Sequence, residues 1–141
     1  MFAFFLTVVL STIFGYVGPE TILVDIINHE RQLQGIAPLE MNWEVARLAR
    51  YKTDEMIRLQ YFGHESPVYG TPSEMLARFH ICAASVGANI AMGQACPQEV
   101  ADAWLSSPPH RVNIFCTDYS QVGVGHARCD DFDYWTLILL P

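Results

Sequence analysis

The fold of this chain is decided by residues 121–140, which read QVGVGHARCDDFDYWTLILL. The two ends of this stretch, residues 121–128 and 134–140, are rich in residues that favour β-strands. Between them, Asp130–Asp133 supplies the polar residues of a turn. Two such runs joined by a short polar turn predict an antiparallel hairpin.

The sequence before the hairpin is mainly helical in pattern. Asn42 and Thr71 are each placed to cap a helix, and a proline at the first helical position follows both Thr71 and Cys96. Helices are expected over residues 19–34, 43–59, 72–79 and 97–107, the last of them ended by Pro108 and Pro109. Ala84–Ala91 has the pattern of a further strand, and residues 60–70 that of an ordered surface loop. Helices that cover a small antiparallel sheet predict an α+β fold.

Several side chains are assigned to the core or to the surface by the same patterns. The inward positions of the second helix include Leu59, and the three tryptophans are expected in the core. They are Trp43, Trp104 and Trp135. His29, His80 and His126 are expected to be exposed or to cap an element.

Composition indicates one soluble domain with a single core. The chain has 141 residues, of which 51% are hydrophobic and 16% charged, with a formal net charge of -7. Lysine and arginine form no cluster, and this excludes the basic surface that nucleic acids and anionic membranes require.

The N-terminus carries a second signal. Residues 2–17 are almost wholly apolar, which is the length of a signal-peptide core and slightly short for a membrane span. Residues 1–18 are therefore interpreted as a signal peptide or as an N-terminal anchor, and a buried core helix is the alternative. Either of the first two places the protein outside the cell or at its surface, with contact to a membrane only through this segment.

Four cysteines, at positions 82, 96, 116 and 129, form an even set without a Cys-x-x-Cys pair. In an exported protein they are expected to form two disulfides. Of the three possible connectivities, Cys82–Cys96 and Cys116–Cys129 are favoured, because each pair brackets a short strand-and-turn segment. Four reduced, buried thiols are the alternative for a cytosolic protein.

A series of short motifs then makes the chain recognisable. The motifs are Asn28-His29-Glu30-Arg31, Gly63-His64-Glu65-Ser66-Pro67, Gly87-Ala88-Asn89-Ile90-Ala91, Ser107-Pro108-Pro109-His110-Arg111-Val112-Asn113-Ile114, Val122-Gly123-Val124-Gly125 and Tyr134-Trp135-Thr136. In this order they resemble a bacterial-type domain of the CAP superfamily (cysteine-rich secretory protein, antigen 5 and pathogenesis-related 1; SCP domain). The resemblance covers residues 22–140, and we place the domain at 19–141.

The resemblance implies an α-β-α sandwich with a small central antiparallel sheet, and a surface cleft. In many family members, two histidines and two glutamates line this cleft and hold a divalent cation such as zinc. His64 and His110 match the two histidine positions, whereas the glutamate positions hold Ala88 and Ser107.

A zinc site normally needs three or four protein ligands. His64 and His110 are the candidate metal ligands, and Glu65 or Asp102 could replace the missing acids. The alternative is that the two histidines stabilise the surrounding loops through hydrogen bonds. Asn89 and Asn113 are expected to hold turns.

The expected function is that of a secreted or surface-anchored binding module rather than an enzyme, because binding survives the loss of an acidic group better than catalysis does. Its partner would be a small apolar molecule, a lipid, a peptide or another protein. The cleft residues would be His64, His110, Ser66, Ser107, Ala88 and Asn89.

Two other functions stay open. One is a hydrolase, either metal-dependent or with Ser66 or Ser107 as nucleophile and a histidine as base, although the acid that would orient the imidazole is replaced by Ala88. The other is a structural protein of a cell wall or spore coat.

Overall fold

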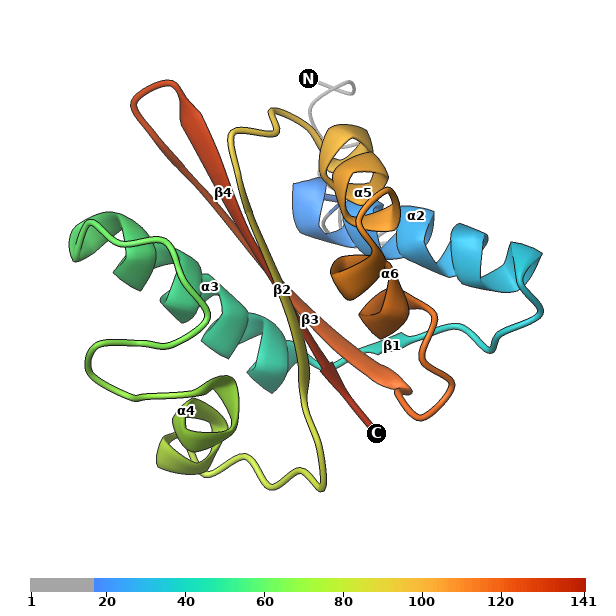
Figure 1. Cartoon of the computed structure of the whole chain (residues 1–141), viewed down its shortest axis with the longest axis horizontal. Coiled ribbons are helices and arrows are strands. Elements are labelled where there is room, and N and C mark those ends of the chain that lie inside the picture. Colours follow the sequence, from blue (N-terminus) through green and yellow to red (C-terminus); the bar gives the residue numbers. More distant parts are fainter. Residues whose placement is uncertain (1–16) are drawn as a thin grey trace, which may run out of the picture.

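The computed structural model describes residues 17–141. The predicted leader, residues 1–18, lies outside the described residues apart from its last two positions. None of the helices in the described part of the chain is long and apolar enough to cross a membrane. The elements follow one another in this order (Figure 1): α2 (Pro19–Leu33), β1 (Glu40–Met41), α3 (Trp43–Arg58), α4 (Pro72–Arg78), β2 (Gly87–Met92), α5 (Pro97–Leu105), α6 (Pro108–Ile114), β3 (Gln121–Cys129) and β4 (Phe132–Leu140).

The strands form one sheet in the order β1-β3-β4-β2. β3 and β4 make the predicted hairpin, with Gln121 opposite Leu140 and Cys129 opposite Phe132. The turn holds only residues 130 and 131, so the hairpin is tighter than predicted, and Asp130 takes the left-handed conformation with φ of 53°. β2 is antiparallel to β4, but β1 is parallel to β3, and the sheet is therefore mixed rather than wholly antiparallel.

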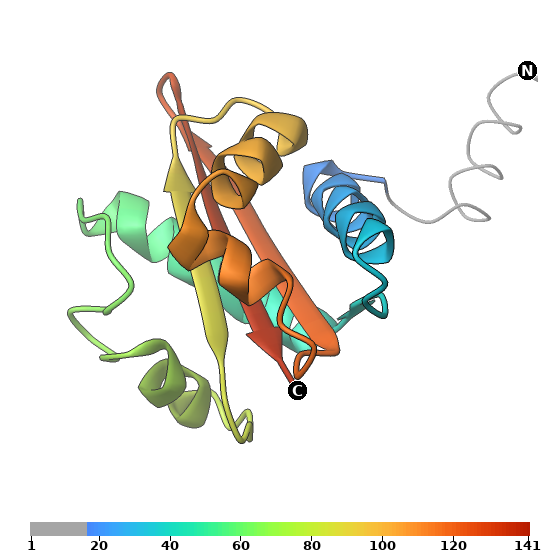
Figure 2. The same cartoon turned by 45° about the vertical axis from the view of Figure 1, so that its right-hand side comes forward.

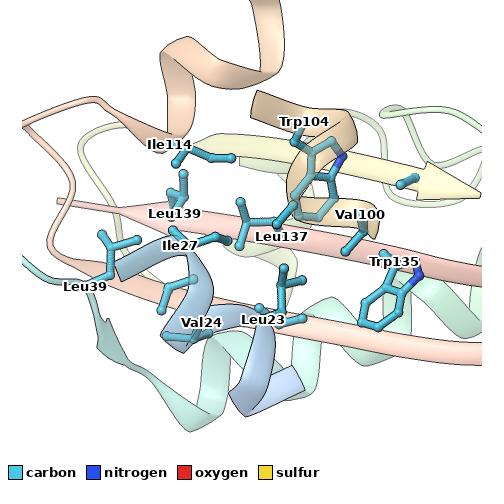
Figure 3. Packing of buried hydrophobic residues seen from close by; sticks show 14 residues of the cluster. Leu23, Val24, Ile27, Leu39, Val100, Trp104, Ile114, Trp135, Leu137 and Leu139 are labelled. Carbon is cyan, nitrogen blue, oxygen red and sulfur yellow. The ribbon is translucent and has the colours of Figure 1, made fainter. Parts of the chain in front are cut away.

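Helices cover both faces of this sheet, as the predicted α-β-α sandwich requires. Figure 2 shows α3 and α4 on one side and α2, α5 and α6 on the other. The larger core cluster lies under the second group, where Trp104 and Trp135 pack with leucines and valines of α2, α5 and the strands (Figure 3). A smaller cluster lies under α3 and α4.

The helix caps form as the sequence predicts. Asn42 Oδ1 accepts the backbone amides of Glu44 and Val45 at the start of α3, at 3.0 and 3.2 Å. Thr71 and Glu74 exchange hydrogen bonds at the start of α4. The helix that begins at Pro97 ends at Leu105, before Pro108, as predicted, but the short helix α6 that begins at Pro108 was not predicted. Proline is tolerated there, since the first amide of a helix has no partner within the helix.

Two core assignments are also wrong. Trp43 is the first residue of α3 and is 60% exposed, and Leu59, just beyond the end of that helix, is 37% exposed. The buried face of α3 is formed by Val45, Leu48 and Met56, and Trp43 lies off that face. Trp104 and Trp135 are buried, as predicted.

Each predicted disulfide pair lies at opposite ends of a strand, so neither predicted bridge is formed. Cys82 precedes β2 and Cys96 follows it, while Cys116 precedes β3 and Cys129 ends it. Even β2 carries the chain about 20 Å from end to end, whereas the Cα atoms of bridged cysteines lie about 4.4–6.8 Å apart. All four thiols are free in the structure. Because β2 and β3 run in the same direction, the cysteines that share an end of the sheet are 82 with 116 and 96 with 129.

One buried arginine ties α2 to the far part of the chain. Arg31 is only 1% exposed, and its guanidinium donates to four backbone carbonyls. The acceptors are those of Ala37, Ile114, Cys116 and Tyr119, at 2.9, 2.7, 3.0 and 3.1 Å. Burial lowers the pKa of Arg31, and these acceptors satisfy its donors at the end of α6.

The closest helix-to-sheet approach is that of α3 to β3. A methyl group added at Gly123 would lie 2.4 Å from the backbone nitrogen of Ala46, and one added at Gly125 would lie 2.3 Å from the carbonyl oxygen of Ala49. Backbone atoms cannot retreat as a flexible side chain can. The Val-Gly-Val-Gly motif therefore sets how closely α3 lies on the sheet.

We expect Gly125→Ala to lower the free energy of unfolding by about 3 kcal/mol, because the added methyl group overpacks the contact with α3. Gly63→Ala is the matched control, since nothing lies within 4 Å of the added atom, and its effect should stay within about 0.5 kcal/mol. Urea unfolding of both variants measures the difference. Equal destabilisation by the two changes would contradict the close approach.

Candidate functional site

The loop of residues 60–70 holds His64 at the end of α3. Within this loop, Ser66 Oγ accepts the amides of Val68 and Tyr69 at 3.1 and 2.9 Å. The backbones of Ser66 and Gly70 also bond to each other in both directions, at 2.7 and 3.0 Å. The loop is therefore ordered, as predicted. His64 precedes this pinched segment, and its ring has no hydrogen-bond partner within residues 17–141.

His110 lies on α6 and is positioned by two asparagines. Asn89 Nδ2 donates to the His110 carbonyl at 3.1 Å, and Asn113 Nδ2 donates to Asn89 Oδ1 at 2.9 Å. The His110 ring itself lies 2.9 Å, through Nδ1, from Ser107 Oγ. Asn89 is fully buried, so this chain of bonds ties α6 to strand β2.

The two histidines lie within electrostatic reach of each other. Burial is the main cause that lowers the pKa of His64, and the neighbouring charges of His110 and Lys52 lower it further. The loop after α3 and the helix α6 thus bring together two rings that are far apart in the sequence. A proton on the His64 ring is therefore disfavoured by the cations around it.

A small apolar recess lies beside His64, where α3 and α4 meet β2 and β4. Its cavity volume is about 20 Å³, the room of a single water molecule. Its walls are formed by Leu48, Lys52, His64, Pro72, Met75, Ala88, Ile90, Thr136 and Ile138. Ala88 belongs to the face of β2 that carries this recess, while the next residue, Asn89, points to the opposite face and to α6.

A buried charged network, which the sequence analysis missed, stands behind the recess. Lys52 Nζ donates to the hydroxyl of Tyr61 at 2.8 Å, and that hydroxyl donates to Glu55 Oε1. Lys52 is 4% exposed and Glu55 1%. Both stand on the apolar face of α3 between Leu48 and Met56, and that position could have revealed them.

Burial governs the protonation of this network. It lowers the pKa of Lys52, and the negative charge of Glu55 opposes this shift. It also raises the pKa of Tyr61 well above its usual value, and the hydrogen bond from Tyr61 to Glu55 raises that pKa further. Glu55 Oε2 is buried and has no hydrogen-bond partner among residues 17–141.

The described residues do not fit a zinc centre. No three or more His, Cys, Asp or Glu side chains of residues 17–141 converge as metal ligands would. Glu65 is exposed, and Asp102 is exposed on α5, where it accepts a hydrogen bond from Gln98. His64 and His110 are thus brought near each other without a third ligand.

The two candidate nucleophiles are in different situations. Ser66 is buried, and its Oγ is occupied by two loop amides. Ser107 does contact His110, but no hydrogen bond joins that ring to an Asp or Glu in the described part of the chain. A serine nucleophile with a base is present there, whereas the acid that would orient the base is not.

The remaining histidines lie away from this site. His29 and His80 are exposed, as predicted. His126 is not, because its ring stacks on Trp135 at a centroid distance of 4.1 Å and its Nε2 lies 2.7 Å from Asp133 Oδ1. Its strand pairing, invisible in the local sequence, brings these partners together.

Residues 24–139 match the CAP family, described as the cysteine-rich secretory protein family. The chain belongs to the CAP family. It is 40% identical to the uncharacterized protein YkwD of Bacillus subtilis (strain 168) over 114 residues. The aligned region covers 81% of this chain and 44% of that protein. It is also 31% identical over 106 residues to the uncharacterized membrane protein YlbC of the same organism, covering 75% of this chain and 31% of that protein. The chain therefore spans less than half the length of these relatives.

Solved structures show the same CAP fold. An extracellular protein containing an SCP domain from Bacillus anthracis superposes with a TM-score of 0.81 at 26% identity, over 87% of this chain and 40% of that one. An outer surface protein from Borrelia burgdorferi superposes with a TM-score of 0.78 at 20% identity, over 85% of this chain and 90% of that one. The α-β-α sandwich is thus that of known CAP domains.

We expect the pKa of His64, followed by NMR, to lie below 6.5, and His110→Gln to raise it by removing a neighbouring positive charge. His29→Gln, on the exposed face of α2, is the matched control and should leave the titration of His64 unchanged. Because the folded state binds this proton less readily than the unfolded state, His64 should reduce stability as the pH falls through the interval between 6.5 and its folded pKa. A His64 titration that is identical in both variants would contradict the proximity of the two rings.

Proposed function

We propose that this CAP domain is a binding module, secreted or held at the cell surface, that takes an apolar group of its ligand in the recess beside His64. The observation that carries the proposal is the apolar wall formed by Met75, Ala88, Ile90 and Ile138, with His64 beside it. Concave apolar sites with few polar groups are the usual form of small-molecule and peptide sites.

The size of the recess limits what enters it. A volume of about 20 Å³ holds a group of one or two heavy atoms and not a whole lipid or sterol. The ligand would therefore insert one short apolar group, such as part of an alkyl chain or one side chain of a peptide or protein partner. The rest of the ligand would lie over the loop of residues 60–70, where Phe62 and Val68 are exposed.

The location outside the cell is supported by the relatives and by the leader. The Bacillus anthracis structure is of an extracellular protein, and the Borrelia burgdorferi structure is of an outer surface protein. The apolar residues 2–17 give this chain its own export or anchoring signal.

A hydrolase is the second candidate, and the contact between Ser107 and His110 favours it. The geometry supports it less well, because the ring has no acidic partner in the described part of the chain and Ser107 is also the residue that precedes the first turn of α6. Release of nitrophenol from a nitrophenyl ester by the full chain, abolished by Ser107→Ala, would favour the hydrolase over the binding module.

The binding module is tested with 1-hexanol, a neutral amphiphile, by NMR titration of the full chain. We expect Ala88→Leu to weaken binding about tenfold or more, because the larger side chain fills the recess. Ala83→Leu makes the same change on the exposed loop before β2 and should bind hexanol as the wild type does.

Hexanol-induced shifts should map to the resonances of Met75, Ile90 and Ile138. Binding that both leucine variants retain would place the site elsewhere, and the absence of any hexanol binding would overturn the proposal.

A further inference from the structure

The outer edge of β3 has a neighbouring strand only at its first two residues. β1 pairs with Gln121 and Val122, whereas β3 continues to Cys129. Beyond Val122, the described residues place no further strand on this side of the sheet. A strand edge of this kind presents backbone amides and carbonyls with which another chain can pair.

Two backbone groups mark the outer side of β3. The Val122 carbonyl accepts the amide of the residue that follows β1, at 2.9 Å, and the His126 amide donates to Glu20 Oε1 at 3.1 Å. Because the backbone groups of a strand alternate between its two sides, Val124 and Arg128 also direct theirs outward. These groups form the row with which another strand would pair.

An ion pair between two helices closes this edge. Glu20 is the second residue of α2, and Arg50 belongs to α3. Arg50 Nε donates to both carboxylate oxygens of Glu20, at 2.9 and 2.8 Å, and Arg50 Nη2 donates to Oε2. Because α2 and α3 cover opposite faces of the sheet (Figure 2), this ion pair passes around the outer edge of β3. Val124, whose backbone faces the same edge, is fully buried.

We infer that the outer edge of β3 is a pairing surface for a second copy of this chain, and that the ion pair between Glu20 and Arg50 keeps it closed in the monomer. The Glu20 carboxylate accepts the His126 amide where the carbonyl of a neighbouring strand would otherwise accept it. Loss of the ion pair would leave this amide and its neighbours open to another strand. The recess beside His64 is separate from this surface, because no residue of β3 lines it.

A second copy supplies a matching row of backbone groups. In an antiparallel pair related by a two-fold axis, the amides of each β3 meet the carbonyls of the other. Among the side chains of β3, Arg128 is the only Asp, Glu, Lys or Arg. It donates to Asp133 Oδ2 of its own chain at 3.0 Å. Two copies of this edge therefore bring no unpaired like charges together.

The opposite edge of the sheet limits the assembly to two copies. There, Trp104 donates to the Ile90 carbonyl of β2 at 3.1 Å, and Asn113 donates to the Ala88 carbonyl at 3.4 Å. These side chains of α5 and α6 occupy the groups that a third strand would need. Pairing through β3 is thus expected to give a closed dimer.

Sedimentation velocity of the full chain tests this surface. We expect Glu20→Ala to lower the dissociation constant of the dimer about tenfold or more relative to the wild type, because it removes both the ion pair and the acceptor of the His126 amide. Asp25→Ala removes an exposed carboxylate from the same helix and is the matched control, which should associate as the wild type does. Glu20→Gln keeps an oxygen for the amide and should have a smaller effect.

A second change tests whether the dimer forms through this edge. Arg128→Pro removes an outward-facing amide and leaves in place the amides that join β3 to β4. Added to Glu20→Ala, it should return the dissociation constant to that of the wild type. Hydrogen exchange of the His126 amide should be faster in dilute Glu20→Ala than in the wild type, and should slow as the concentration rises and the dimer forms.

Two results would overturn the inference. One is a folded Glu20→Ala variant that associates no more strongly than Asp25→Ala. The other is association of Glu20→Ala that Arg128→Pro does not weaken, which would place the contact elsewhere on the molecule. Should Glu20→Ala fail to fold, as judged by circular dichroism, Glu20→Gln is measured alone and with Arg128→Pro, and the same two results decide.

Discussion

The absence of side chains at Gly123 and Gly125 is the constraint on which the rest of this structure depends. It lets the backbone of α3 lie directly against β3, with no side chain between them at either position. The hydroxyls of Thr53 and Thr136 then fix α3 along the neighbouring strand, β4. This placement sets the buried position of Lys52 and the point at which the chain leaves α3 toward His64. The recess is thus a consequence of how closely one helix can approach the sheet.

The other half of the site depends on β2, which is an edge strand of the sheet formed by the described residues. The side chains of Asn113 and Trp104 donate to the carbonyls of Ala88 and Ile90, at 3.4 and 3.1 Å, and so cover this edge with α5 and α6 rather than with another chain. Because side chains alternate along the strand, Ala88 faces the recess and Asn89 faces α6, where it takes part in the hydrogen bonds that position His110. A single strand therefore positions groups on both faces of the sheet.

These two arrangements give the site an electrostatic character that differs from that of a metal centre. The recess is lined by apolar side chains with Lys52 and His64 among them, and the acid of the adjacent network, Glu55, accepts a hydrogen bond from Tyr61. The CAP scaffold therefore keeps His64 and His110 close to each other, while the wall of the recess beside His64 consists of Ala88 and other apolar side chains. The family's two glutamate positions hold Ala88 and Ser107 here, and Ala88 lines the recess together with His64.

The sequence by itself determined the helices, the caps at Asn42 and Thr71, the hairpin and the membership of the CAP family, because each depends on residues close together in the chain or on motifs in a fixed order. The exposure of Trp43, the second helix at Pro108, the parallel pairing of β1 and the separation of the cysteine pairs were decided by the tertiary structure. So were the buried Lys52, Tyr61 and Glu55 network and the position of His126 on Trp135. Burial and long-range pairing depend on which elements pack together, and no local pattern specifies that.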